Sequence, residues 1–355
     1  MTAPELPLVS ILTPVYNNAA YLAECIQSVL DQTYQNFEYI IVNNCSTDGT
    51  LEIANNYAAR DERIRVHTNE KFVDVIANHN IAFNLMSPNA KYCKVVSGDD
   101  AIFPECVAKM VELFETSPSV GIVGVYQISG RAVKWQGPKY PAVVTSGLEI
   151  GRRCFLDSQI FIDGQGVLGF GTPTSLMYRA DIVRSTHTFY PNPSPHSDTS
   201  ACFQTLQSSS FGFVYQVLAC ERTHAETQTS TSLKMNRYLS ATLNDLKQYG
   251  PSYLSVQELE EQIKRTLRSY HRFLAVSLFT RSQDEAFWAY HKGRLQELGY
   301  PLGRLTILKA AIAAVLEKSV NPGLVFKELW KRLLPCQAAA KQSSAIAKNL
   351  LPKCQ

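Results

Sequence analysis

The sequence has no apolar run long enough to cross a bilayer. Its longest apolar window, residues 305–316, has 12 residues and includes Lys309, whereas a transmembrane helix needs about 20 apolar residues. The N-terminal stretch MTAPELPLVSILTPVY has no basic segment and carries proline inside its apolar run, so we expect no signal peptide. Both absences favour a cytoplasmic protein over a secreted or membrane-spanning one.

The cysteines form no pattern that indicates a metal site or a disulfide framework. The sequence contains no CxxC pair and no Cys/His cluster. An odd number of dispersed cysteines is typical of free thiols in a reducing compartment. The nine residues are Cys25, Cys45, Cys93, Cys106, Cys154, Cys202, Cys220, Cys336 and Cys354.

Net charge is small, at +3, and the N-terminal part has no basic stripe that would indicate a nucleic-acid partner. The charge is unevenly distributed, however. Residues 301–355 contain nine Lys or Arg and two Glu, a net charge of +7. This basic end predicts either peripheral contact with an anionic membrane surface or a solvated tail.

Short apolar runs alternate with amphipathic helical patterns up to about residue 126. Short connections between such elements predict a parallel, doubly wound α/β sheet. The expected strands are 8–13, 37–42, 64–67, a short apolar strand in 91–100 that stops at the glycine and the two aspartates, and 120–126.

From about residue 230 the apolar spacing becomes helical throughout, and Ser255 and Glu258 have the spacing of a capping box. We therefore expect an α/β domain over residues 1–228. An α-helical region, basic at its end, is expected over residues 229–355.

Polar clusters follow three of the expected strands, at residues 13–18, 43–48 and 97–100. Ligands of doubly wound sheets bind beyond the carboxyl ends of the strands, so we expect the three clusters to line one pocket. Asp99 and Asp100 are suitable ligands for Mg²⁺ or Mn²⁺. Two aspartates after a strand also suit a turn or a helix cap.

In this order, the motifs resemble those of the family 2 glycosyltransferases. The resemblance covers about residues 7–225 and rests on VSILTPVYNN (9–18), SVLDQTYQNFEYIIVNNCSTDGT (28–50), SGDD (97–100) and PSVGIVG (118–124). It implies the GT-A fold, a mixed, mostly parallel sheet flanked by helices. It also implies a nucleotide-diphosphate sugar as the donor.

The resemblance places the nucleoside of the donor at the first two polar clusters. Thr13 and Pro14 would lie under the nucleoside, and Tyr16 would be able to stack on its base. Asn43 stands where the family usually has an Asp that reads the base, which leaves the base open because an amide both donates and accepts. The other implied donor-binding residues are Asp48, which equally suits a helix cap, His79, Asp99 and Arg222.

The implied cofactor is a divalent metal ion, Mn²⁺ or Mg²⁺, which would neutralise charge on the leaving diphosphate. The family motif is commonly Asp-x-Asp, and Ser97 replaces its leading acid here. The resemblance therefore implies Asp100 as the direct ligand, with Asp99 near the metal or the ribose. His224 would reach the metal or a phosphate. With one acid fewer, we expect weaker metal binding.

Sugar transfer also needs a base that takes the proton of the acceptor hydroxyl. In the family this base is an Asp in the second half of the domain, and Asp198, in the sequence HSDT, matches that position. Asp198 is equally placed to be the N-cap of the next helix. We interpret His196 as a loop histidine.

These features predict an inverting glycosyltransferase that moves a sugar onto a hydroxyl of a glycan or lipid-linked acceptor. One alternative is a sugar-nucleotide-binding protein with reduced catalysis, favoured because Asn43 and Ser97 each replace an acid. A nucleotidyltransferase would need a glycine-rich, basic loop after the first strand, which residues 14–18 do not provide.

Overall fold

The structure is a computed structural model, and it describes residues 6–130, 132–134, 138, 140–157, 170–191, 196–222, 235–280, 284–303 and 305–312. The strands are β1 Val9–Val15, β2 Phe37–Asn43, β3 Ile64–Thr68, β4 Tyr92–Val95, β5 Ala101–Ile102, β6 Val120–Ser129, β7 Ala132–Lys134, β8 Val144–Ser146, β9 Leu176–Arg179 and β10 Ser210–Glu221. The helices are α1 Leu22–Leu30, α2 Thr50–Ala58, α3 Val75–Asn84, α4 Cys106–Thr116, α5 Gly147–Leu156, the 3₁₀ turn η1 Pro173–Ser175, α6 Ala180–Arg184, α7 Ser197–Leu206, α9 Tyr238–Gln248, α10 Gly250–Tyr253, α11 Val256–Thr280 and α12 Glu285–Glu297.

The described strands form one mixed, mostly parallel sheet, as the sequence predicts. Its order is β3-β2-β1-β4-β9-β6-β10-β5, with β7 on β6 and β8 on β10. Strands β1 to β4 are parallel, and β10 is parallel to β6. Strand β9 runs antiparallel between β4 and β6. Because β2, β1 and β4 are neighbours, their carboxyl ends meet at one edge.

Helices cover both faces of the sheet, and the strands are accordingly apolar on both sides. In β2, Tyr39 and Ile41 pack against helices α1, α2 and α4, whereas Ile40 and Val42 pack on the opposite face. That second face is covered by α3, α5, α6 and α7. The period of two along a strand sends alternate side chains to opposite layers, which gives the doubly wound arrangement.

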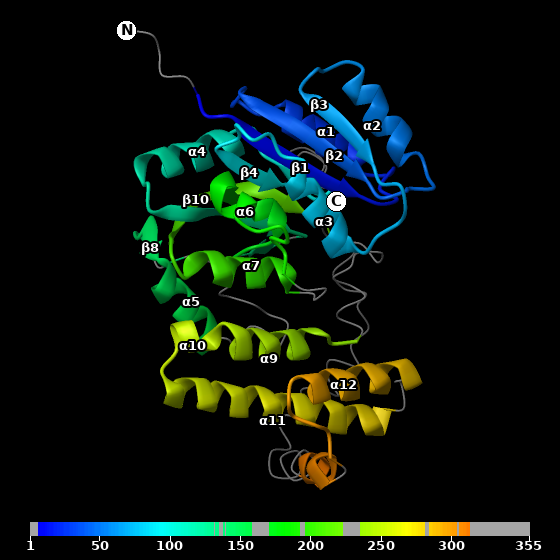
Figure 1. The fold of residues 1–355 in the computed structure, drawn as a ribbon, viewed down its shortest axis with the longest axis vertical. Coiled ribbons are helices and arrows are strands. Elements are labelled where there is room, and N and C mark those ends of the chain that lie inside the picture. Colours follow the sequence, from blue (N-terminus) through cyan, green and yellow to red (C-terminus); the bar gives the residue numbers. More distant parts are fainter. Residues whose placement is uncertain are drawn as a thin grey trace, which may run out of the picture.

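The C-terminal helices pack on the second helical layer. Helix α7 lies between the sheet and α9, and α11 and α12 lie beyond α9 (Figure 1). Leu246 of α9, Tyr249 between α9 and α10, and Tyr253 of α10 belong to the same buried apolar cluster as Phe203 of α7. The expected capping box is present, since the amide nitrogen of Glu258 donates to Ser255 Oγ at 3.3 Å. The helical region therefore shares a core with the α/β part.

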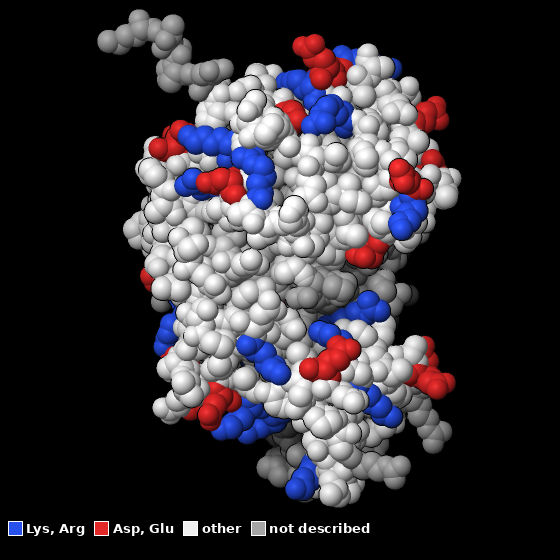
Figure 2. Space-filling model, in the orientation of Figure 1, with Lys and Arg blue, Asp and Glu red and all other residues white. Residues whose placement is uncertain are grey.

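In the described part of the chain, no helix has both the length and the apolar character needed to span a membrane. The run at 305–316 is helical from residue 305 to residue 312, and Leu305, Leu308 and Ile312 are exposed there. The basic tail after residue 312 lies outside the described residues. Basic and acidic side chains are interspersed over the face shown in Figure 2.

Candidate active site

The sheet brings the three predicted polar clusters to one edge. Val15 of β1 is paired with Asn43 of β2, and Leu12 of β1 is paired with Val95 of β4. The clusters 13–18, 43–48 and 97–100 therefore follow adjacent, parallel strand ends. This is the edge at which ligands of such sheets bind.

Gly98 lets the SGDD turn lie directly against the loop after β1. The turn is closed by the amide nitrogen of Asp100, which donates to the carbonyl of Ser97 at 2.9 Å. A Cβ added to Gly98 would lie 2.5 Å from Val15 Cγ1 and 2.6 Å from the side-chain amide of Asn18. No side chain fits at this distance, so the close approach of the two loops requires glycine.

Asp100 is buried in the turn, with a side chain held from two directions. It is 4% exposed. One carboxylate oxygen accepts from Thr174 Oγ1 at 2.6 Å, and the other accepts from the amide nitrogen of Arg222 at 3.1 Å. Helix α4 begins at Cys106 after the N-cap Glu105. The alternative in which the two aspartates cap this helix is therefore wrong.

Negative charge is concentrated around Asp100. Burial raises the pKa of Asp100 well above its ordinary value, and the charges of Asp99 and Glu221 raise it further. A carboxylate that is crowded by like charges is stabilised by a bound cation. The chemistry of this group of oxygen donors thus fits a hard divalent ion.

The two aspartates also fit the way in which proteins commonly bind Mg²⁺ and Mn²⁺. Within the described ranges, no three His, Cys, Asp or Glu side chains gather into a metal cluster. Such ions are often bound by one or two carboxylates together with substrate phosphates. Asp99 and Asp100 are suited to that arrangement. His224, the third expected ligand, lies outside the described residues.

A buried lysine that the sequence interpretation missed lies behind this turn. Lys94 of β4 is fully buried, and its Nζ donates to the carbonyl oxygen of Thr174 at 2.6 Å and to that of Leu176 at 3.3 Å. Burial lowers the pKa of Lys94. The lysine anchors the segment whose Thr174 hydroxyl binds Asp100. A lysine inside an otherwise apolar strand was the available signal.

Exposed aromatic rings stand in the loops that follow β1 and β3. Tyr16 is 44% exposed and Phe72 is 59% exposed, and their ring centroids are 4.8 Å apart in an edge-on arrangement. Aromatic faces of this kind stack on nucleic bases. Phe72 was not predicted, because it lies in an irregular stretch after β3.

Other predicted donor-binding residues have roles inside the protein. Thr13 is fully buried, and its hydroxyl lies 2.9 Å from the Tyr39 hydroxyl. The structure thus gives the Thr13 side chain a core position. Pro14 is partly buried. Asn43 is 1% exposed, and its side-chain oxygen accepts from the amide nitrogen of Ser46 at 3.2 Å, which shapes the loop after β2.

Asp48 connects two loops of the edge. Its carboxylate accepts from the amide nitrogens of Ala19 and Thr50, both at 3.0 Å. It therefore joins the β1–α1 loop to the start of α2, whose N-cap is Gly49. These hydrogen bonds within the protein account for an aspartate at this position without any contact to the sugar nucleotide.

His79 stands on α3 with its ring toward the loop that leads to α7. Its Nδ1 lies 2.8 Å from the carbonyl oxygen of Val75, and its ring stacks on Tyr190 at 5.4 Å. Burial lowers the pKa of His79. The next residue, Asn80, exchanges two hydrogen bonds with the backbone of Tyr190, at 3.0 and 3.1 Å. This segment of α3 therefore fixes the Tyr190 loop.

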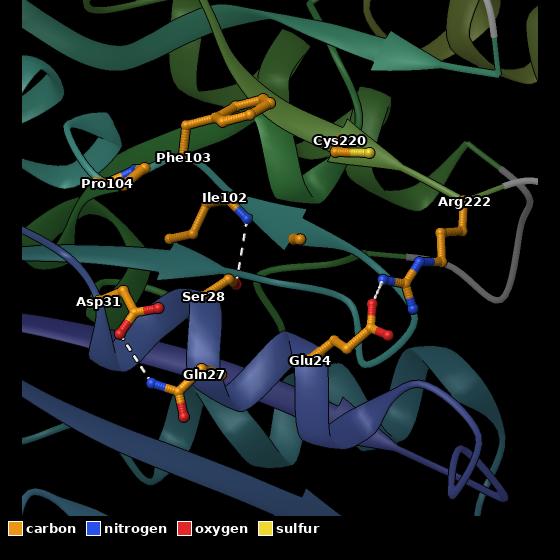
Figure 3. Close-up of a pocket in the computed structure, with 10 residues that line it drawn as sticks. Glu24, Gln27, Ser28, Asp31, Ile102, Phe103, Pro104, Cys220 and Arg222 are labelled. Atoms are coloured by element: carbon orange, nitrogen blue, oxygen red, sulfur yellow. Dashed lines mark hydrogen bonds and ion pairs between the residues drawn. The ribbon is translucent and has the colours of Figure 1, made fainter. Parts of the chain in front are cut away.

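The guanidinium of Arg222 is directed toward helix α1. It is 9% exposed, forms an ion pair with Glu24 and lies over the ring of Tyr21 at 5.2 Å. Figure 3 shows this pair beside a cavity of about 370 Å³. The contribution of Arg222 to the SGDD turn is its backbone nitrogen. The cavity is lined by Glu24, Gln27, Ser28, Asp31, Ala101, Ile102, Phe103, Pro104, Cys220 and Arg222.

Asp198 lies in the first turn of α7. The helix begins at Ser197 with His196 as its N-cap residue, so the interpretation of Asp198 as the N-cap is wrong. Its carboxylate accepts from the amide nitrogen of Thr199 at 2.8 Å. Burial raises the pKa of Asp198, Asp245 adds to the rise, and His196 opposes it. A carboxylate with a raised pKa is a stronger base than an ordinary one.

A doubly wound, mixed sheet with an acidic turn and exposed aromatic rings at its carboxyl edge defines a GT-A type of nucleotide-sugar site. The solved structures agree with this fold. Staphylococcus aureus TarS 1–349 in complex with UDP-GlcNAc matches with a TM-score of 0.61 and 15% identity, over 89% of this chain and 92% of that one. The mannosyltransferase PcManGT from Pyrobaculum calidifontis, in complex with GDP-Man and Mn²⁺, matches with a TM-score of 0.52 and 12% identity, over 89% of each chain.

The sequence comparisons give the family. Residues 10–185 match the model for glycosyl transferase family 2, and the chain belongs to the family 2 glycosyltransferases. The putative glycosyltransferase EpsE of Bacillus subtilis is 37% identical over 33% of this chain and 42% of its own length. TuaG of the same organism, a putative teichuronic acid biosynthesis glycosyltransferase, is 36% identical over 33% of this chain and 46% of its own length. The matched region thus spans less than half of each of these two relatives.

Proposed function

We propose that this protein transfers a sugar from a nucleotide-diphosphate donor to an acceptor hydroxyl, with inversion at the anomeric carbon. The observation that carries the proposal is the buried carboxylate of Asp100, which lies at the ligand-binding edge of the sheet among other negative charges. A bound cation would relieve this crowding of like charges. The relatives and the family supply the reaction class.

Asp99 and Asp100 would hold a divalent ion together with the phosphates of the donor. When bound, such an ion neutralises the charge that builds on the leaving diphosphate. Thr174 and the backbone of Arg222 orient the Asp100 carboxylate for this contact. The exposed face of Tyr16, with Phe72 beside it, is suited to hold the base of the donor.

Asp198 takes the proton of the acceptor hydroxyl in the proposed reaction. The oxygen of the acceptor then forms a bond to the anomeric carbon while the bond from that carbon to the diphosphate breaks. The raised pKa of Asp198 favours proton uptake. We propose that the acceptor is a glycan or a lipid-linked sugar. The name of the relative TuaG, a putative teichuronic acid biosynthesis glycosyltransferase, supports an acceptor of the glycan class.

The test compares the full chain with Asp198→Asn. Donor binding is measured by calorimetry with UDP-GlcNAc and GDP-mannose in the presence of Mn²⁺, and turnover is measured as release of the nucleoside diphosphate. We expect Asp198→Asn to bind the donor as the unaltered chain does and to lose turnover. Equal turnover in the two proteins would place the base elsewhere. Binding without turnover in the unaltered chain would favour a sugar-nucleotide-binding protein.

A further inference from the structure

A hydrogen-bonded triad connects the first turn of α7 to the C-terminal helices. Nδ1 of His196 lies 2.9 Å from one carboxylate oxygen of Asp245, and the side chains of both residues are 3% exposed. The hydroxyl of Ser200 donates to the other oxygen of Asp245 at 2.7 Å. Asp245 belongs to α9, whereas His196 and Ser200 belong to the start of α7. One buried carboxylate thus holds this turn at two points.

Asp198 lies between the two anchored residues. His196 and Ser200 are one helical turn apart and are also joined by a backbone hydrogen bond of 2.7 Å. When both ends of a turn are fixed to one carboxylate, the turn cannot rotate about its axis without breaking a hydrogen bond to a charged group. The direction of the Asp198 side chain is therefore set by α9. The titratable groups that interact electrostatically with Asp198 are Tyr178, Tyr190, His196, Cys202 and Asp245.

Docking of the helices does not account for this carboxylate. Leu246 of α9 and Tyr249, the residue that follows the helix, already supply apolar contacts to the α/β part. A buried charge with polar partners is often no more stabilising than an apolar group of similar volume, because desolvation offsets the attraction. What Asp245 provides beyond apolar packing is orientation, since hydrogen bonds have preferred directions.

We propose that Asp245 is a positioning residue for sugar transfer and that it acts through His196 and Ser200 to hold Asp198 toward the acceptor hydroxyl. The proposal rests on the proposed function, because it takes Asp198 as the base. It makes the C-terminal helical region a part of the transfer machinery. We therefore expect a protein in which this triad is broken to lose sugar transfer and to keep donor binding.

The experiment uses the full chain and three variants. Asp245→Ala removes both hydrogen bonds, and Asp245→Asn keeps an amide that can donate to and accept from the same partners. Tyr253→Phe is the matched control, because the Tyr253 hydroxyl also bonds to α7, at the carbonyl oxygen of Phe203. That carbonyl lies more than a turn beyond Asp198 along the helix. Release of nucleoside diphosphate from UDP-GlcNAc and GDP-mannose is measured with Mn²⁺, and kcat and KM are separated.

A misplaced base lowers kcat on the order of 10²-fold, so we expect a loss of this size in Asp245→Ala, with the KM for the donor unchanged. Asp245→Asn should recover most of the loss, and Tyr253→Phe should keep the kcat of the unaltered chain. An unchanged kcat in Asp245→Ala, or an equal loss in Tyr253→Phe, overturns the positioning role.

If Asp245→Ala does not fold, Ser200→Ala takes its place, since it removes one of the two bonds to Asp245. A smaller loss of kcat at unchanged donor KM then supports the proposal, and no loss overturns it. An unaltered chain that binds donor but releases no nucleoside diphosphate overturns the proposed function as well. If only the positioning role is wrong, the unaltered chain still releases nucleoside diphosphate, and Asp245→Ala releases it at the same rate.

Discussion

At the scale of single residues, Asp100 and Asp198 have the same chemical group but different surroundings. Asp100 accepts two hydrogen bonds, and the charges of Asp99 and Glu221 lie close to its carboxylate. Asp198 accepts a bond from the backbone of its own turn and lies near the charge of Asp245. The first environment suits a cation ligand, and the second suits a proton acceptor.

Asp100→Asn tests whether the charge of Asp100 serves binding or folding. The folded state raises the pKa of this carboxyl. The stability it contributes is therefore present below its unfolded pKa and is lost as the pH rises through the folded value. The asparagine oxygen can accept from the amide nitrogen of Arg222, and its amide nitrogen can donate to the Thr174 hydroxyl, so both partners are kept without the charge. We expect the melting temperature of Asp100→Asn, without metal, to exceed that of the unaltered chain by a margin that grows with pH. A lower melting temperature at neutral pH would contradict this.

The pH dependence of turnover tests Asp198. A base must be ionised, and the pKa of Asp198 is raised above its ordinary value of 3.8, chiefly by burial. Turnover should therefore fall on the acid side at a higher pH than it would for an ordinary aspartate. The measurement is kcat/KM against pH, with donor binding followed at each pH to separate the titration of Asp100. An acid limb at or below the ordinary value of 3.8 would be evidence against Asp198.

At the scale of elements, the SGDD turn depends on the loop after β1. This dependence gives a prediction for Gly98→Ala, because the new methyl group would lie within 2.6 Å of both Val15 and Asn18. Overpacking of this kind costs about 1–3 kcal/mol of stability, and it would displace Asp99 and Asp100. We expect weaker donor binding in calorimetry with Mn²⁺ and a lower melting temperature.

Gly293→Ala is the control for this prediction. Gly293 lies within α12, and a Cβ there meets no atom within 4 Å. Alanine inside a helix stabilises it by about 0.5–1 kcal/mol relative to glycine. Donor binding should stay unchanged in this variant. If Gly98→Ala binds donor as tightly as Gly293→Ala does, the close approach of the two loops is not needed for the site.

Most of the parallel half of the sheet could be predicted from the sequence, because each strand and helix there has its own apolar period. The antiparallel strand β9 and the turn η1 could not, because their positions depend on long-range pairing with β4 and β6. The same holds for the site. Asp100 and Asp198 carry local motifs, whereas Thr174 and Asp245 become partners only through tertiary contacts.

The side-chain directions of Thr13 and Arg222 show another limit of sequence reasoning. A residue at the correct strand end has two possible directions, and its sequence position does not decide between them. Thr13 faces Tyr39 in the core, and the guanidinium of Arg222 faces Glu24. A short polar side chain and a long charged one can each be satisfied inside the protein when a partner is close.

At the scale of the whole molecule, the predicted division at residue 228 separates elements that share a core. We propose that the described helices of the C-terminal region, α9 to α12, complete the α/β part and do not form a separate domain. Removing them would expose the apolar surface that α9 and α10 cover through Leu246, Tyr249 and Tyr253. Large exposed apolar patches promote association.

A chain that ends at residue 228 should therefore aggregate or melt at a lower temperature than the full chain, and it should show no turnover. The measurement is size-exclusion chromatography with a thermal melt. A monomeric 1–228 chain with the melting temperature of the full protein would contradict this proposal.

The most direct test of the account is the melting temperature of the full chain with nucleotide-diphosphate sugars, each with and without Mn²⁺, repeated for Asp100→Asn. A ligand that binds the folded state raises the melting temperature. We expect at least one donor to raise the melting temperature further when Mn²⁺ is present, and this added rise to be absent in Asp100→Asn. No rise with any donor, or an equal rise in both proteins, would contradict it.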